Sequence, residues 1–81
     1  MDSIESTTQE SIGTRLKRLR GQLVMTQLEL AIKSGVPLPT VKNIERGFTL
    51  TPRVKTIRSL ARALRVSASY LRNGEISYHN K

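Results

Sequence analysis

Residues 26–47 read TQLELAIKSGVPLPTVKNIERG, and this stretch decides the fold. Thr26, followed three residues later by Glu29, is the pattern of a capping box. The Thr26 hydroxyl can accept the Glu29 backbone N–H, and the Glu29 carboxylate can accept the Thr26 backbone N–H. Gly35 then stops the helix, since glycine takes the left-handed conformation without strain. The first half of the stretch therefore predicts a short, capped helix that ends at a glycine turn.

The second half of the stretch predicts another short helix. We expect it to start near Pro39, because proline suits the first helical position and breaks later ones. Val41 and Ile44 form its inward stripe, and Gly47 ends it. Two short helices joined by a tight glycine turn are the layout of a helix-turn-helix, which presents its second helix to the major groove of DNA.

A further helix is predicted ahead of this unit. Ser11 can cap it, and Gly21 weakens its end. Its apolar residues recur at helical spacing: Ile12, Leu16, Leu19 and Leu23. Basic residues fill its other faces: Arg15, Lys17, Arg18 and Arg20.

Two more helices are predicted after the unit. Thr51-Pro52 repeats the cap-then-proline start, and an apolar stripe follows at helical spacing: Val54, Ile57, Leu60, Ala61 and Leu64. Ser67 caps a last short helix that stops at Asn73-Gly74. Strand-like alternation is missing from the sequence, so the prediction is an all-α fold of five short helices around one core.

The chain of 81 residues has room for one domain. Residues 1–10 are rich in Ser, Thr and Glu, and we expect a flexible acidic arm there. Residues 11–74 form the predicted helical domain, and residues 75–81 form a short flexible tail.

Positive charge is concentrated in the predicted domain. The formal net charge is +8, but residues 11–74 hold thirteen of the fourteen Lys and Arg against two Glu, a net +11. This exceeds the modest charge that solubility needs. Such a field attracts phosphate-rich partners, either nucleic acid or anionic lipid.

Several classes of protein are disfavoured by the sequence. It has no cysteine for disulfide or thiolate chemistry, and no apolar run approaches the ~20 residues of a membrane span. The acidic N-terminus is unlike a signal peptide, so we expect a cytoplasmic protein. His79 stands alone, which predicts no metal site, and no base is placed to activate a Ser or Thr. The prediction is a protein without enzymatic activity, cofactor or small-molecule substrate.

The motifs along residues 11–74 resemble those of the lambdoid phage repressor and Cro family, also called the XRE family, and most of all its small Cro-type members. The matching segments are Ile12-Gly13, Leu16, Leu19-Arg20, Thr26-Gln27, Glu29-Leu30-Ala31, Gly35-Val36, Thr40-Val41, Ile44-Glu45-Arg46-Gly47, Pro52, Leu60-Ala61-Arg62-Ala63-Leu64, Val66-Ser67, Tyr70-Leu71 and Gly74-Glu75. The resemblance implies a compact five-helix, lambda-repressor-like domain. It also implies a bacterial or phage-encoded, nucleoid-associated transcriptional regulator, a repressor that binds double-stranded DNA. Such proteins usually act as a homodimer on a palindromic operator, with half-sites about one helical turn apart.

The resemblance also suggests which residues contact the DNA backbone. The matching glutamine in the family, here Gln27, bonds a phosphate at a helix N-terminus. Arg46 is the next candidate, although it could equally serve as a cation that offsets the helix dipole. Arg53 and Lys55 lie where family members approach the flanking backbone, or else form a solvated face.

Base readout is expected from the start of the second helix of the unit: Leu38, Pro39, Thr40, Lys42 and Asn43. The family generally has a Ser or Thr cap at position 37 and polar residues at 38 and 39, where this chain has Pro37-Leu38-Pro39. Leu38 could touch a thymine methyl or could instead pack on a neighbouring helix. Asn43 is the best candidate for a bidentate contact to adenine. We therefore expect weaker hydrogen-bond readout and more dependence on DNA shape.

The resemblance also implies a structural salt bridge and a dimer interface. Arg20 and Glu45 are expected to form a structural salt bridge that holds the recognition helix in place. The residues placed where family dimers meet are Leu64, Arg65, Val66 and Ala68, although core closure would explain them too.

Two alternatives to a DNA-binding regulator stay open. The first is an antitoxin or antirepressor-like module whose partner is another protein, which the apolar Phe48-Thr49-Leu50 loop and Leu38 favour. The second is a cationic helix set on an anionic membrane. It is the weaker of the two, because the apolar residues are needed for the core and tryptophan is missing.

Overall fold

The structure is a computed structural model that describes residues 10–74. Five helices follow one another along the chain: α1 (Ile12–Gln22), α2 (Gln27–Ser34), α3 (Leu38–Glu45), α4 (Val54–Leu64) and α5 (Ala68–Asn73). The described part contains no strand. The prediction of an all-α, five-helix domain is therefore confirmed. The arm at residues 1–9 and the tail at 75–81, with His79, lie outside the described residues.

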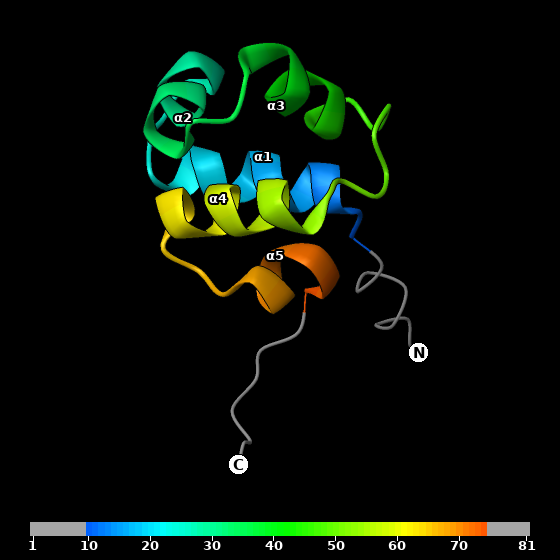
Figure 1. Ribbon diagram of the computed structural model, residues 1–81. Helices are drawn as coiled ribbons and strands as arrows, with labels where there is room; N and C mark the ends of the chain where they lie inside the picture. Colours follow the sequence, from blue (N-terminus) through cyan, green and yellow to red (C-terminus); the bar gives the residue numbers. More distant parts are fainter. Residues whose placement is uncertain (1–9, 75–81) are drawn as a thin grey trace, which may run out of the picture.

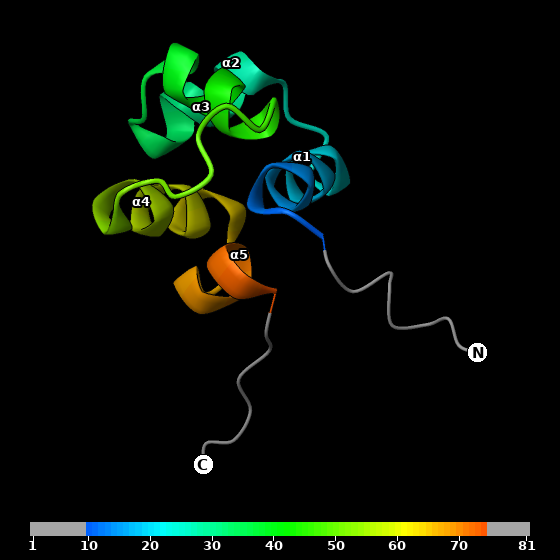
Figure 2. The ribbon, with the colours of Figure 1, turned by 90° about the vertical axis from the view of Figure 1, so that its right-hand side faces the viewer.

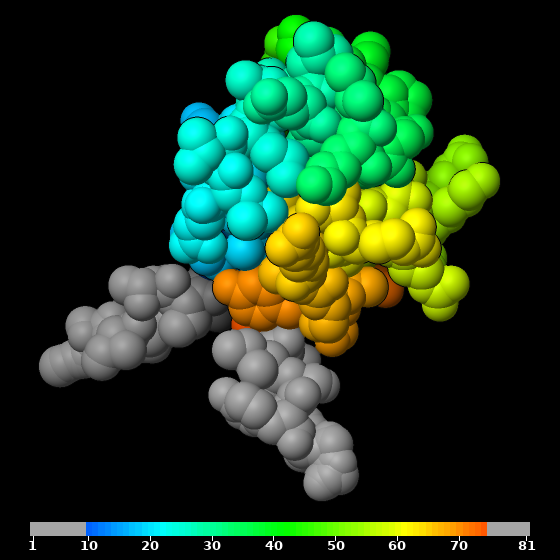
Figure 3. Space-filling view, turned by 90° about the vertical axis from the view of Figure 1, so that its left-hand side faces the viewer, coloured from blue at the N-terminus to red at the C-terminus, as the bar shows by residue number. Residues whose placement is uncertain are grey.

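The helices stack in three levels. Figures 1 and 2 show α1 and α4 in the middle, with α2 and α3 on one side of them and α5 on the other. Helix α1 contacts α3 and α5, while α4 contacts α2 and α5. In the space-filling view of Figure 3 the helices form one continuous surface. The helix-turn-helix thus rests on a platform made by α1 and α4.

The core draws on every helix. Its largest fully buried side chains are Leu16, Leu30, Val41, Ile44, Leu60 and Leu71. Burial of each contributes about 1.5–3 kcal/mol relative to exposure. Leu23 is 42% exposed, because α1 ends at Gln22 and its apolar face ends there too. The prediction that Leu23 continues the apolar face of the first helix is therefore wrong.

The helix starts follow local side-chain chemistry where Ser or Thr is available. Ser11, Thr26 and Ser67 each accept a backbone N–H from the residue three positions on. The Thr26 N–H in turn donates to the Glu29 carboxylate at 2.8 Å, so the predicted capping box forms. Gly35 and Gly74 end their helices with φ of 78° and 77°. These boundaries were predictable because each depends on neighbours in sequence.

Other boundaries differ from the predictions. Helix α3 begins at Leu38, so Pro39 is its second residue, and Pro37 supplies no side-chain cap. Helix α4 begins at Val54 and not at Thr51-Pro52, and no side chain caps it either. Helix α1 continues through Gly21, and the chain reverses at Val24 with φ 55°.

Arg15 is buried, although the sequence predicted it on an outer face. Its side chain is 5% exposed, and its Nη1 donates to the Leu71 carbonyl at 2.8 Å and the Arg72 carbonyl at 3.3 Å. These carbonyls end α5, where a cation offsets the helix dipole. A six-residue helix is too short to be stable alone. Arg15 therefore fastens α5 to α1.

Glu10 belongs to the folded domain, which shifts the predicted boundary at residue 11. Its carboxylate lies 3.4 Å from Arg15 Nε and accepts two hydrogen bonds from Arg18, at 2.9 and 3.0 Å. The Arg18 hydrogen bonds lower the pKa of Glu10 below its ordinary value, despite some desolvation. Arg18 also donates to the Tyr70 hydroxyl at 2.8 Å, so the cluster joins the start of the domain to α5.

Replacing Glu10 with glutamine should destabilise the protein in a pH-dependent way. Near neutral pH we expect a loss of about 0.5–1 kcal/mol in the free energy of unfolding, as for partly exposed pairs. Because the folded-state pKa of Glu10 is lowered, its contribution is full above the unfolded pKa and is lost as pH falls through the folded one. Urea unfolding at neutral and at strongly acidic pH measures this difference. An equal loss at both pH values would contradict the ion-pair origin.

Candidate nucleic-acid interface

The turn between α2 and α3 is short and internally bonded. Gly35 reverses the chain, and its N–H donates to the Ala31 carbonyl at 2.9 Å. Val36 is buried, with its N–H donating to Ser34 Oγ at 3.1 Å. The turn thus fixes the angle between the two helices through one glycine and one buried valine.

A network of three side chains ties α3 to α1 and α2. Arg20 of α1 donates from Nε to Glu45 Oε2 at 2.7 Å and from Nη2 to Oε1 at 3.0 Å. Gln27 at the start of α2 donates its Nε2 to the same Oε1 at 3.0 Å. The Glu45 side chain is 4% exposed. The Arg20–Glu45 pair expected from the resemblance is present, and it links α1, α2 and α3.

Electrostatics explain why Glu45 needs these partners. A carboxylate in the last turn of a helix faces the negative end of the helix dipole, so it is unfavourable without a cation. Arg20 supplies that cation, and its hydrogen bonds with Glu45 raise the pKa of Arg20. Arg20 Nη1 also donates to the Met25 carbonyl at 2.7 Å, which positions the chain just before α2.

Gln27 has a role that the sequence did not predict. One N–H of its amide is engaged by Glu45, and a glutamine amide has two. The second N–H remains for a phosphate, with the amide plane already held by the network. The contact of Gln27 with a phosphate stays a prediction.

The free face of α3 is small and mixed in character. Pro39, Lys42 and Arg46 are exposed, while Thr40 and Asn43 are half-buried. Leu38 is half-buried and packs against the core, the alternative that the sequence left open. Leu38 therefore offers little surface for base contact.

The predicted phosphate residues at the start of α4, Arg53 and Lys55, lie beside the start of α3. Two adjoining surface hollows, of about 390 and 270 Å³, are lined in common by Thr40, Arg53 and Thr56, and Lys55 lines the second. No side chain caps α4, and an uncapped helix N-terminus favours an anion. The start of α4 thus adds positive potential next to the recognition helix.

The loop after α3 is exposed and apolar. Phe48 is 72% and Leu50 69% exposed. The Arg46 guanidinium lies over the Phe48 ring, 5.3 Å from its centroid. Arg46 and Phe48 are separated by one glycine in a turn, and no sequence pattern indicates a contact between two such residues. The sequence therefore did not predict it.

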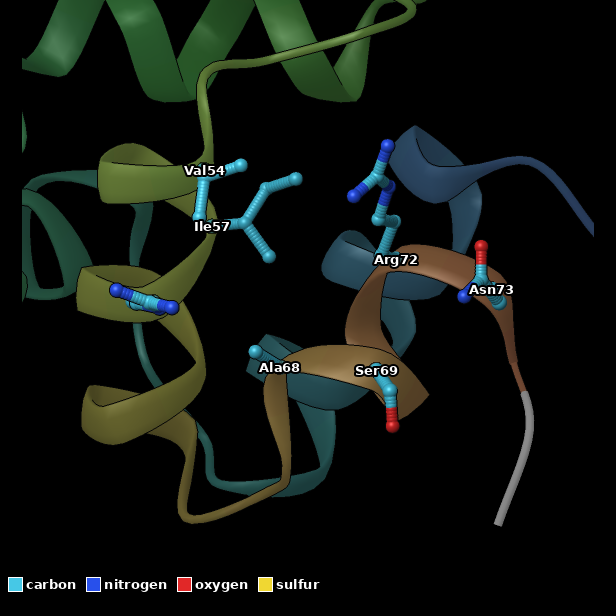
Figure 4. Close-up of a pocket in the computed structure, with 7 residues that line it drawn as sticks. Val54, Ile57, Ala68, Ser69, Arg72 and Asn73 are labelled. Atoms are coloured by element: carbon cyan, nitrogen blue, oxygen red, sulfur yellow. The ribbon is translucent and has the colours of Figure 1, made fainter. Parts of the chain in front are cut away.

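The residues expected at a dimer interface lie in unequal surroundings. Leu64 is 3% exposed and belongs to the core, so its expectation as an interface residue is wrong. Arg65 is exposed, and Val66 and Ala68 are half-buried against the core. Beside Ala68 a hollow of about 220 Å³ opens between α4 and α5 (Figure 4), where Val54 is 51% exposed.

A family model described as Helix-turn-helix matches residues 16–71. The chain belongs to the helix-turn-helix family. The match runs from the middle of α1 into α5 and includes the Arg20–Glu45 network. The fold and the resemblance predicted from the sequence are thereby confirmed for this helix-turn-helix protein.

Two curated relatives from Bacillus subtilis (strain 168) resemble this helix-turn-helix chain. The HTH-type transcriptional repressor RghR is 39% identical over 57 residues, which are 70% of this chain and 42% of the relative. The uncharacterized HTH-type transcriptional regulator RghRB is 39% identical over 54 residues, or 67% and 39% of the two chains. The chain therefore spans about two fifths of the length of these relatives.

A solved structure is also similar. The P22 c2 repressor protein, crystallised with a synthetic operator, superposes with a TM-score of 0.73 at 29% identity, over 80% of this chain and 97% of that one. None of the helices in residues 10–74 of the helix-turn-helix protein has the length and apolarity to cross a bilayer.

Proposed function

We propose that this helix-turn-helix protein is a sequence-specific double-stranded DNA-binding transcriptional regulator, acting as a repressor with α3 in the major groove. The observation that carries the proposal is the three-helix network through Glu45, which holds α3 with Lys42 and Arg46 exposed. The repressor relatives and the fold shared with the P22 c2 repressor support it. The net charge of +8 supplies the attraction to phosphate.

Phosphate contact is proposed for residues near the two ends of α3: Gln27, Arg46, Arg53 and Lys55. Gln27 lies at the N-terminus of α2, and Arg53 and Lys55 lie at the uncapped start of α4. A helix N-terminus near each end of a helix in the groove suits the phosphate backbone that borders the groove.

Base readout is proposed for Asn43 and Lys42, with Thr40 and Pro39 at the groove floor. Asn43 can bond adenine in bidentate fashion, and Lys42 can reach guanine. Because Pro39 has no N–H and Leu38 packs against the core, the start of α3 offers few donors. DNA shape therefore contributes more to sequence choice than in a relative with polar residues at these positions.

A homodimer on a palindromic operator is proposed through the region between α4 and α5. Val54 and Ala68 give the hollow there apolar surface, and Val66 is half-buried in the loop between the two helices, but Arg58 and Arg72 also line the hollow. Two copies would bring these cations together, which opposes association in free solution. Two adjacent half-sites on one duplex hold two copies at a high effective concentration, so dimerisation is favoured on the operator.

The test combines selection of duplexes from a random pool with a salt series. We expect an enriched palindrome with half-sites about one helical turn apart, and log affinity that falls linearly with log salt. Asn43→Ala should lose about 1–3 kcal/mol of discrimination at one base pair. Arg53→Ala should weaken all duplexes alike, while Arg62→Ala, an exposed arginine at the other end of α4, serves as its matched control. No affinity for any duplex at low salt would overturn the proposal.

A second candidate rests on the exposed Phe48 and Leu50. Exposed apolar loops often mark protein interfaces, which fits an antitoxin or antirepressor-like module. Such a module would bind its partner with little salt dependence and would ignore duplex DNA. The same salt series therefore distinguishes the two functions.

A further inference from the structure

We infer that Phe48 is a positioning residue, whose ring holds the Arg46 guanidinium in place for a DNA phosphate. The inference rests on the proposed function and adds a residue to its phosphate contacts. The guanidinium carbon of Arg46 lies 5.3 Å from the centroid of the Phe48 ring. A cation over an aromatic face within about 6 Å is attracted to the ring quadrupole.

The loop geometry fixes the backbone of Phe48 independently of Arg46. Gly47 takes φ 84° and turns the chain back over the end of α3. The Phe48 N–H then donates to the Asn43 carbonyl at 2.9 Å, and the Thr49 N–H donates to the same oxygen at 3.2 Å. These two bonds cap α3 and anchor the residue that carries the ring. The Cα that carries the aromatic ring is therefore held at the end of α3, within reach of the Arg46 side chain.

The guanidinium keeps its donors while it contacts the ring. Arg46 is exposed, and within residues 10–74 no acceptor is paired with its side chain. A guanidinium has five N–H donors in its plane, which suit a phosphate in bidentate fashion. Contact with an aromatic face does not use those donors. The ring therefore restricts the arginine without competing with a phosphate.

Restriction of Arg46 improves binding through entropy. A free arginine side chain has many rotamers, and ordering it on a phosphate opposes association. If the ring already limits these rotamers, less freedom is lost when the phosphate binds. The 72% exposure of Phe48 is consistent with this role, because a ring that served the core would be buried.

The test is a double-mutant cycle read by fluorescence anisotropy with a labelled duplex of mixed sequence at low salt. Phe48→Leu should weaken binding about two- to fivefold, the range for an exposed cation–π contact. Arg46→Ala should weaken it and reduce the slope of log affinity against log salt by about 0.9, the value for one phosphate. With Arg46→Ala already present, Phe48→Leu should have no further effect. Phe48→Tyr, which keeps the ring, should bind like the unmodified protein.

One control variant and three contrary outcomes test the inference. Leu50→Ala changes an equally exposed apolar residue of the same loop and should leave affinity unchanged. An equal effect of Phe48→Leu with and without Arg46 would show that the ring acts by itself, and would overturn the inference. So would unchanged affinity of Phe48→Leu while the unmodified protein binds. If the unmodified protein binds no duplex, the proposed function itself fails, and the inference fails with it.

Discussion

Gly13→Ala should lower the free energy of unfolding by about 2–3 kcal/mol and weaken duplex binding, because α1 and α3 touch at this residue. A Cβ added at Gly13 would overlap the carbonyl oxygen of Ile44 and lie 3.2 Å from that of Glu45. Both obstacles are backbone atoms of α3, so they can move only if the helix moves. The substitution would therefore displace the helix that we propose enters the groove.

Gly21→Ala is the matched control for this prediction. Gly21 lies on the same helix and takes no positive φ, and a methyl group added there would meet no heavy atom within 4 Å. An alanine in a helix interior is favoured over glycine by about 0.5–1 kcal/mol, so this variant should be more stable. Thermal or urea unfolding of the two variants measures both effects. A Gly13→Ala protein as stable as the Gly21→Ala protein would show that α3 is not packed as closely as described.

Glu45→Ala should lower the free energy of unfolding by about 3–5 kcal/mol, since it leaves a partly buried cation without its partner. The Arg20 side chain is 15% exposed, and both of its hydrogen bonds to a carboxylate go to Glu45. Gln27 would lose its partner at the same time. Duplex binding should fall as well, because three helices lose their common contact. Urea unfolding and anisotropy with a labelled duplex measure the two effects.

Two further variants test the origin of the Glu45 effect. Arg46→Ala alters the adjacent, exposed residue and should change stability by less than about 0.5 kcal/mol while still weakening DNA binding. Replacing Arg20 and Glu45 together by apolar residues should restore much of the lost stability, because no charge is then stranded. A double variant as unstable as Glu45→Ala alone would argue that the pair is not the cause.

The role of Gln27 was predictable from the sequence only in part. Its place after Thr26 predicted the start of α2, and the resemblance implied a contact with a phosphate. That its amide is also held by Glu45, 18 residues along the chain, depends on how α2 and α3 pack. The sequence likewise placed Leu64 on the apolar face of its helix. That its side chain is only 3% exposed follows from the packing of the whole domain.

The sequence by itself determined the elements whose causes are local. The caps at Ser11, Thr26 and Ser67, the glycine stops and the helical apolar spacing each depend on residues within about one turn of one another. The cationic character of the domain is likewise a property of composition. These features were enough to predict five helices and a helix-turn-helix.

Only the tertiary structure decided several contacts between residues far apart in the chain or on either side of a turn. It buried Arg15 against the end of α5, added Gln27 to the Arg20–Glu45 pair that the resemblance implied, placed Arg46 over Phe48 and packed Leu38 against the core. Each of these contacts depends on the distance between helices or on the path of a loop. The spacing of residues along one helix predicts neither the distance nor the path. Long polar side chains have many rotamers, and it is the packed backbone that selects among them.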